Sequence, residues 1–391
     1  MKDTESSPTV SEQPCATASS RRRITIGLPS SADPAERRFP ITPEAAQMLT
    51  DRGFAVKMQT GAAAPIHYSD NAYSRVGVGV CSRSEALGCD IVIHLAPLPP
   101  ADISAMRRGA MLLSLLSLAR QTKATIKALT DRNIIAIAID LVKDRHGNTP
   151  FADILSEING LAAMTIASAI LADPLRGKGI LLGGVAGVIP CETAVIGSDL
   201  SARAAAKAAI GAGSSVRMFD NDVYSLREAI GALDGRGVGS TLHPRVLANA
   251  LRTADIVIVA DSIQPPVIDS SEVADMKKGV LVFDLSHDPG RVFPSLPCID
   301  LATAAAAPTE GCRCFSNTGN AVPRTAAMAL SNSFITFFNE IASSEGALNA
   351  LKMLPGIKAA AYTFMKNVVN PQIAEIAGCR AKDINIFLTL S

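Results

Sequence analysis

The sequence lacks an excess of charge of either sign. Its 37 lysine and arginine residues nearly balance 36 aspartate and glutamate residues. A protein that binds nucleic acid or an anionic membrane surface gains much of its affinity from a strongly cationic surface. We therefore expect no nucleic acid and no membrane among the partners of this chain.

Long uninterrupted apolar runs are also missing. Hydrophobic residues make up 48% of the chain, but glycine, proline or charge interrupts each apolar stretch before the roughly 20 residues that a transmembrane helix needs. Residues 1–22 have no apolar core and are rich in Ser, Thr, Pro and Glu. This composition excludes a signal peptide and predicts a disordered tail.

The eight cysteines do not form a pattern of metal ligands. Only Cys312 and Cys314 lie close together, and no second pair and no histidine cluster accompanies them. This spacing predicts that the chain has no metal site. The cysteines fit a reducing cytoplasm, where they serve as small buried apolar side chains, and we expect a cytoplasmic protein.

One segment has the outline of a dinucleotide-binding unit. Residues 193–197 read as a strand, residues 200–212 as an Ala-rich helix, and residues 216–220 as a second strand that ends in Asp220. In such a unit glycine permits the tight turn, the helix N-terminus meets the pyrophosphate, and an acid about 20 residues on accepts a ribose hydroxyl. Gly197 supplies the first glycine of the G-x-G-x-x-G/A pattern, but Asp199 occupies the second glycine position. The pattern predicts the fold and weakens the prediction of the cofactor.

Strand-like and helical patterns alternate along the chain. This alternation predicts parallel sheets covered by helices. The fold class is therefore α/β, with two doubly wound Rossmann-like domains, a cleft between them and a C-terminal helical segment. The predicted strands are residues 24–28, 54–58, 90–95, 111–116, 134–138, 193–197, 216–220, 256–260 and 280–285, and helical spacing covers residues 42–52 and 121–131.

Three further helices organise the domains. Residues 156–171 form a long helix that joins the two domains, and residues 325–343 and 348–365 are helical after the second sheet is complete. We expect the C-terminal helices to return to the first domain. The predicted boundaries are a discontinuous substrate domain, residues 23–149 plus 323–391, and a nucleotide-binding domain, residues 150–322.

Three motifs carry a resemblance to a known family. Residues 36–43 are similar to E-x-R-V-A-x-T-P, residues 177–188 to G-K-G-x-L-L-G-G-V-P-G-V, and residues 317–325 to N-x-x-x-A-V-P-R-T. With these motifs the chain resembles the alanine dehydrogenase and pyridine nucleotide transhydrogenase α-subunit family, and more closely alanine dehydrogenase. The resemblance implies NAD as cofactor, an amino acid or 2-oxo acid as substrate, interconversion of L-alanine with pyruvate and ammonia, and a homo-oligomer, a hexamer.

The resemblance also implies roles for individual residues. The substrate-carboxylate arginine of the family falls on Arg38, and a guanidinium suits a carboxylate; the alternative is that Arg37 and Arg38 are a solvated pair on a loop. The catalytic aspartate beside the nicotinamide falls on Asp288. The alternative for Asp288 is a turn-forming residue before Pro289 and Gly290.

Four positions match the cofactor contacts of the family: Ser156, Gly197, Asp220 and Asn317. For Ser156 a helix N-cap is an alternative that is compatible with cofactor contact. The basic residue that normally follows the ribose acid by five positions is replaced by Ser225, and Arg227 compensates only in part.

The catalytic positions depart from the family. Its histidine falls on Ser117, and its lysine falls on Leu95 or Ala96, with no lysine anywhere in residues 91–100. Serine and leucine neither polarise a carbonyl as a cation does nor move protons near neutral pH. His94 and His287 are candidate substitutes, with an ordinary structural histidine as the alternative for each.

Asp199 adds an electrostatic objection to NAD. At about 4 Å from a phosphate oxygen and an effective dielectric constant of about 20, its carboxylate would repel the phosphate by about 4 kcal/mol. Three functions follow as hypotheses: an NAD-dependent alanine dehydrogenase with impaired or altered chemistry, a non-catalytic relative that keeps the fold for binding or assembly, and a transhydrogenase α subunit. The third is the weakest, because no membrane domain and no linker to one follows.

Overall fold

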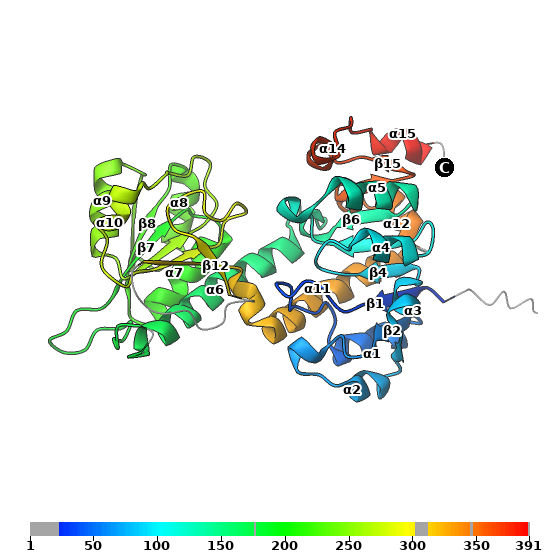
Figure 1. Ribbon diagram of the computed structural model, residues 1–391, viewed down its shortest axis with the longest axis horizontal. Coiled ribbons are helices and arrows are strands. Elements are labelled where there is room, and N and C mark those ends of the chain that lie inside the picture. Colours follow the sequence, from blue (N-terminus) through cyan, green and yellow to red (C-terminus); the bar gives the residue numbers. More distant parts are fainter. Residues whose placement is uncertain (1–22, 176, 302–311, 345–346, 390–391) are drawn as a thin grey trace, which may run out of the picture.

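The computed structural model describes residues 23–175, 177–301, 312–344 and 347–389. It contains two α/β domains side by side, connected by long helices (Figure 1). The tail predicted for residues 1–22 lies outside the described residues. The predicted fold class, two parallel-sheet α/β domains with a helical C-terminal segment, is confirmed.

In the described part of the chain, the first sheet has eight strands in the order β15-β14-β6-β5-β4-β1-β2-β3. Strands β1 to β6 are parallel, in the doubly wound order 3-2-1-4-5-6. The antiparallel strands β14 and β15 extend the edge beside β6. The bounds are β1 (Thr25–Leu28), β2 (Ala55–Gln59), β3 (Gly79–Cys81), β4 (Ile91–Ile93), β5 (Met111–Ser114), β6 (Ile135–Ala138), β14 (Ala361–Phe364) and β15 (Asn367–Val368).

The second sheet, again counted over the described residues, has seven parallel strands in the order β12-β13-β11-β10-β7-β8-β9. Its strand order reverses between β7 and β10, as that of the first sheet reverses between β1 and β4. In open α/β sheets, ligands bind outside the carboxyl ends of the strands near such a reversal. The bounds are β7 (Glu192–Ile196), β8 (Ser215–Phe219), β9 (Gly237–Ser240), β10 (Ile256–Val259), β11 (Leu281–Asp284), β12 (Cys298–Asp300) and β13 (Arg313–Ser316).

Helices cover both sheets and the apolar cores lie between them. Along β5, Met111 and Leu113 face one core and Leu112 faces another, because successive side chains of a strand point to opposite faces. The same alternation places Ile258 and Val257 of β10 in two different cores. The helices over the sheets are α1 (Pro43–Asp51), α2 (Asp70–Ser74), α3 (Arg83–Leu87), α4 (Pro100–Ala105), α5 (Lys123–Asp131), α7 (Leu200–Gly211), α8 (Val223–Gly231), α9 (Pro244–Thr253) and α10 (Ser270–Ala274).

Two long helices, α6 (Pro150–Ala172) and α11 (Pro323–Ser343), connect the domains. Helix α6 also packs closely against α7, and Gly160 marks the contact. A Cβ atom at Gly160 would collide with the carbonyl oxygen of Ser201 and lie 2.8 Å from the amide nitrogen of Ala205. Only glycine allows the two helix backbones to approach this closely.

After α11 the chain stays with the first domain. Phe334 and Phe338 of α11 lie in the core of the first sheet, and β14 pairs with β6. This path matches a first domain built from two separate segments. We propose the boundaries given above, residues 23–149 plus 323–391 and residues 150–322.

The prediction of a helix over residues 348–365 is wrong in its second half. The chain forms α12 (Ala347–Met353) and α13 (Pro355–Ala359) and then strand β14, followed by α14 (Pro371–Ala377) and α15 (Ile384–Thr389). All four residues of β14 are buried, and Tyr362 and Thr363 have the aromatic and β-branched side chains that pack well in strands. The free edge of β6 therefore decides the structure of this segment.

Among the described residues, α6 is the one helix long and apolar enough to cross a membrane by length and composition. The sequence analysis expected no apolar stretch long enough for a transmembrane helix, and α6 departs from that expectation. In the structure it packs against α7 and α11.

The contact between α6 and α7 is testable. Gly160→Ala should lower the free energy of unfolding by about 1–3 kcal/mol, because the methyl group has no space. Gly211→Ala is the matched control, since its Cβ would meet no heavy atom within 4 Å; it should be neutral or stabilise by up to about 1 kcal/mol. Urea denaturation measures both, and equal stability of the two variants would contradict the close approach.

Candidate ligand-binding cavity between the domains

A cavity of about 670 Å³ lies between the two domains. The first domain supplies Arg38 from the loop after β1, Ser117 from the loop after β5 and Asp140 from the end of β6. The second domain supplies Asp284 at the end of β11 and His287 just after it. The carboxyl ends of strands from both sheets therefore face one polar space.

Arg38 is held in this lining by its neighbour Glu36. Its Nε donates to one carboxylate oxygen at 2.7 Å and its Nη2 to the other at 2.5 Å, and both side chains are largely buried. Burial alone would lower the pKa of Arg38, but the charge and hydrogen bonds of Glu36 outweigh it and raise that pKa. Arg38 is therefore a fixed cation in the cavity, and not a solvated loop residue.

Asp140 is a cavity residue that the sequence analysis missed. Its carboxylate accepts a hydrogen bond from the amide of Leu116 at 2.9 Å. Burial raises the pKa of Asp140, and the amide of Leu116 and the charges of His287 and Arg38 offset this only in part. Its position just after the predicted strand 134–138 was the available signal, because ligands bind at the carboxyl ends of parallel strands.

His287 also lines the cavity, paired with Asp261. Its Nδ1 forms an ion pair with the Asp261 carboxylate, and its amide donates to the same carboxylate at 3.1 Å. The hydrogen bond to Asp261 raises the pKa of His287, with the charges of Asp261, Asp140 and Asp199 acting in the same direction. Asp261 thus favours the protonated form of this exposed imidazole and holds it at the rim of the cavity.

Asp288 is the residue to which the resemblance assigned the catalytic aspartate. It is exposed on the turn after β11 and is not part of the cavity lining. Asp284 is the acid of this motif that faces inward, and it accepts hydrogen bonds from the amides of Ser286 and Gly290. The turn-forming alternative fits Asp288, and its catalytic role stays a prediction.

The positions of the missing histidine and the missing lysine lie in different surroundings. Ser117 lines the cavity in a left-handed backbone conformation, with φ of 43°. Leu95 and Ala96 are 2% and 3% exposed and lie outside the cavity lining, and Leu95 belongs to the apolar core. Leu95→Lys would therefore bury an ammonium group among apolar side chains, at a large desolvation cost.

His94 does not replace the missing groups. It is 4% exposed, and its Nδ1 lies 2.6 Å from the carbonyl oxygen of Ala96. Since a carbonyl only accepts, Nδ1 carries the proton. Burial lowers the pKa of His94, and the ring is absent from the cavity lining. The structural alternative fits this histidine.

The helix N-terminus predicted to meet a pyrophosphate is capped by one of the protein's own side chains. Gly197 makes the tight turn with φ of 106°, and Asp199 then caps helix α7. The Asp199 carboxylate accepts from the amide of Ala202 and the hydroxyl of Ser201, each at 2.8 Å. Burial raises its pKa, and these hydrogen bonds offset part of the rise. A helix N-terminus binds anions through free amide groups, and here the Asp199 carboxylate already accepts from one of them.

The predicted ribose acid is similarly engaged. Asp220 is 3% exposed, and it accepts from Ser198 Oγ at 2.7 Å, from Ser262 Oγ at 3.0 Å and from the amide of Asp222 at 3.0 Å. Arg227 lies over the ring of Tyr224 and so points its charge elsewhere. Of the described residues that line the cavity, none belongs to the turn 197–199 or is Asp220. These residues fit a dinucleotide poorly.

The other two predicted cofactor residues differ in their relation to the cavity. Asn317 lines the cavity and donates to the carbonyl oxygen of Ala35 and to the carboxylate of Asp300. Ser156 is inside α6 and does not line the cavity. The N-cap of α6 is Thr149, so the N-cap alternative for Ser156 is wrong.

Two doubly wound sheets with a polar cavity between their carboxyl ends define a two-domain, Rossmann-like α/β protein. More narrowly, the chain belongs to the alanine dehydrogenase/PNT family. The model of the family's N-terminal domain matches residues 27–162, and that of its C-terminal domain matches residues 163–371. This family is a family of oxidoreductases.

Individual relatives agree with this assignment. The chain is 30% identical to an alanine dehydrogenase of Mycolicibacterium smegmatis over 327 residues, which cover 82% of this chain and 88% of the relative. A solved L-alanine dehydrogenase superposes with a TM-score of 0.79 at 24% identity, covering 90% of this chain and 99% of that one. A transhydrogenase from Sinorhizobium meliloti gives a TM-score of 0.72 at 20% identity, with 88% and 100% covered. At these identities the two structures show a shared fold.

The His287–Asp261 pair predicts a measurable titration. The pKa of His287 should lie above its usual value of about 6.5 and fall back toward it in Asp261→Asn. The imidazolium and its ion pair should be complete below about pH 6.5 and lost as pH rises through the raised pKa. NMR of the histidine ring protons measures both. Asp288→Asn is the control, because Asp288 is not among the acids that raise the pKa of His287, and it should leave that pKa unchanged. A wild-type pKa at or below about 6.5 would contradict the pairing.

Proposed function

We propose that this chain binds a small amino acid or 2-oxo acid in the cavity between its domains, and that its NAD-linked oxidation of L-alanine is slow or absent. One observation carries the proposal. The cavity keeps charged groups suited to such a ligand, whereas the groups that would anchor a dinucleotide are engaged by the protein's own side chains.

Charge complementarity supports the amino acid or 2-oxo acid. The Nε and Nη2 of Arg38 donate to Glu36, and Nη1 has no protein partner among the described residues, which leaves it for a ligand carboxylate. When its imidazole is protonated, as the pairing with Asp261 favours, His287 adds a second positive charge at the rim. Asp140 lines the same cavity and is suited to the ammonium group of an amino acid.

The occupied anchor points argue against efficient use of NAD. Asp199 caps α7 where a pyrophosphate would approach, and both oxygens of Asp220 accept from protein donors. Ser117 replaces the proton-transferring histidine in the cavity lining. A positioned acid–base group contributes roughly 10² to 10⁴-fold to a rate, so its loss predicts slow turnover.

The second candidate is an active NAD-dependent alanine dehydrogenase that uses another proton-transfer group. His287 favours it, because it lies at the cavity with a raised pKa and is oriented by Asp261. A histidine held by a carboxylate is a common arrangement for general acid–base catalysis. Under this alternative His287→Gln would remove activity.

We further propose a homo-oligomer, with the hexamer as the state that the resemblance implies. A group of large apolar side chains near the start of the second domain supports it, and each is more than half exposed: Leu175, Leu181, Val185, Val188 and Ile189. Exposed apolar patches of this kind mark protein–protein contacts. The cytoplasmic location remains a prediction.

Ligand binding by Arg38 is directly testable. Arg38→Gln should weaken the binding of pyruvate at least tenfold, because the fixed cation at the cavity is lost. Arg37→Gln is the matched control, since Arg37 is the exposed neighbour outside the lining. Isothermal titration calorimetry with pyruvate and with L-alanine measures both variants. Equal affinities for the two variants, or no binding of either ligand by the wild type, would reject this site.

The cofactor half is tested by Asp199→Gly. The wild type should bind NADH weakly, and the variant should bind it at least tenfold more tightly because the repelling carboxylate is gone. Nicotinamide fluorescence measures this, and Asp269→Gly, which removes the N-cap acid of α10, controls for loss of a cap. Adding Ser117→His to Asp199→Gly should then raise alanine deamination. An ordinary enzymatic rate in the wild type would contradict the proposal and favour the second candidate.

A further inference from the structure

Two cysteines of the second sheet lie beside Asp284, one of the acids that line the cavity. Cys298 of β12 and Cys314 of β13 stand opposite each other in register. Cys314 is also opposite Val282 of β11, and Asp284 follows Val282 by two residues. Because side chains two apart in a strand share a face, all three side chains project from the same side of the sheet.

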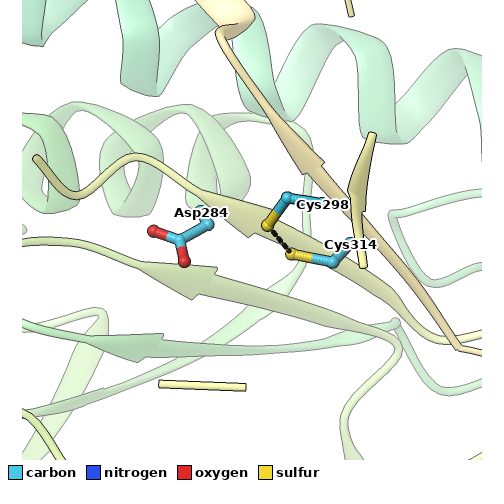
Figure 2. A group of neighbouring side chains, drawn as sticks. All are labelled: Asp284, Cys298 and Cys314. Atoms are coloured by element: carbon cyan, nitrogen blue, oxygen red, sulfur yellow. Dashed lines mark hydrogen bonds between the residues drawn. The ribbon is translucent and has the colours of Figure 1, made fainter. Parts of the chain in front are cut away.

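Their potential ligand atoms lie close together. The two sulfur atoms are 2.9 Å apart, and one carboxylate oxygen of Asp284 and both sulfurs lie within 4.8 Å of one another. Figure 2 shows the sulfur atoms directed toward each other, with Asp284 on the adjacent strand. Asp284 and Cys314 are buried and Cys298 is half-buried. A carboxylate buried beside two thiols is rare in an apolar core.

We propose that Asp284, Cys298 and Cys314 bind a thiophilic divalent metal ion of the zinc class. Thiolate sulfur combined with a carboxylate oxygen is a donor set that zinc accepts. The sequence analysis had predicted no metal site, because it considered only the spacing of Cys312 and Cys314. In the proposed site Cys314 is instead combined with Cys298, 16 positions earlier. The two cysteines are close only because β12 pairs with β13.

The geometry needs a small adjustment. Two thiolates on one tetrahedral zinc ion, each about 2.3 Å from the metal, are about 3.8 Å apart, so the two sulfurs would separate by about 0.9 Å through side-chain rotation. Asp284 is already oriented. One oxygen accepts from the amide and hydroxyl of Ser286, at 3.1 and 2.6 Å, and the other accepts from the amide of Gly290 at 2.8 Å. Such outer contacts hold a metal-binding carboxylate in place.

The fourth ligand would be water. Asp284 also lines the interdomain cavity, so this carboxylate connects the site to the route by which an ion and a water molecule arrive. Binding replaces two sulfur–hydrogen bonds by two metal–sulfur bonds and releases two protons to solvent. No electrons are transferred, and no oxidant is required.

Cobalt(II), a spectroscopic substitute for zinc, tests the site in the full-length protein after reduction and treatment with a chelator. We expect one equivalent per chain, with the visible bands of a tetrahedral ion and a thiolate-to-cobalt charge-transfer band. Zinc should displace cobalt and raise the melting temperature. Cys298→Ser and Cys314→Ser should each abolish the charge-transfer band or weaken binding at least tenfold.

Cys312→Ser is the matched control, because Cys312 lies two residues from Cys314 but its sulfur faces the carbonyl oxygen of Val273. It should bind cobalt as the wild type does. The proposal is overturned if the fully reduced wild type binds no cobalt or zinc, or if Cys298→Ser retains the spectrum. It is also overturned if mass spectrometry finds a Cys298–Cys314 disulfide and the reduced pair binds no metal, which would make this pair a redox pair. Circular dichroism verifies that each variant is folded.

Discussion

The packing of α6 against α11 is the contact on which the cavity depends. The ring of Phe151, in the first turn of α6, lies 4.8 Å from that of Phe334 and 6.0 Å from that of Phe337. The chain leaves the first domain through α6 and returns to it through α11. Because these two connecting helices pack together, the carboxyl ends of the two sheets are held facing each other.

A short turn before α11 transmits this arrangement to the cavity. Asn159 of α6 accepts from the amide of Gly319 at 3.0 Å, and Asn320 accepts from the amides of Arg37 and Arg38 at 2.7 and 3.3 Å. Asn317 reaches Ala35 from the same turn. Hydrogen bonds therefore link the connecting helix to the loop that carries Arg38. A change in helix packing would move the cation and the acids of the cavity relative to each other.

The charges at the cavity are paired in advance. Arg38 is held by Glu36, Arg120 by Asp33 and His287 by Asp261. Fixed charges of this kind suit a small charged ligand because little reorganisation is needed on binding. Around the first turn of α7, pairing within the protein instead disfavours a ligand. There Asp199 and Asp220 take up the donors and acceptors that a dinucleotide would use.

Local sequence patterns predicted the long elements well. All nine predicted strands are present, with bounds shifted by one or two residues, because their buried apolar runs have few alternatives. The short strands β3 and β9 contain glycine and only a few residues, and their position at a sheet edge is a tertiary effect. The strand at residues 361–364 is likewise a tertiary effect, because its pairing with β6 overrides the local helical spacing.

The sequence alone determined the α/β class, the family resemblance and the loss of the histidine and lysine, because these depend on periodicity and on residue identity. Only the tertiary structure decided which acids face the cavity. Asp284 lines the cavity and Asp288 does not, because Asp284 ends strand β11 whereas Asp288 lies in the exposed loop that follows it. It also showed that Asp140 lies near Arg38 and His287, and that Cys298 meets Cys314. Those encounters depend on the order of strands in a sheet, which residue spacing along the chain does not specify.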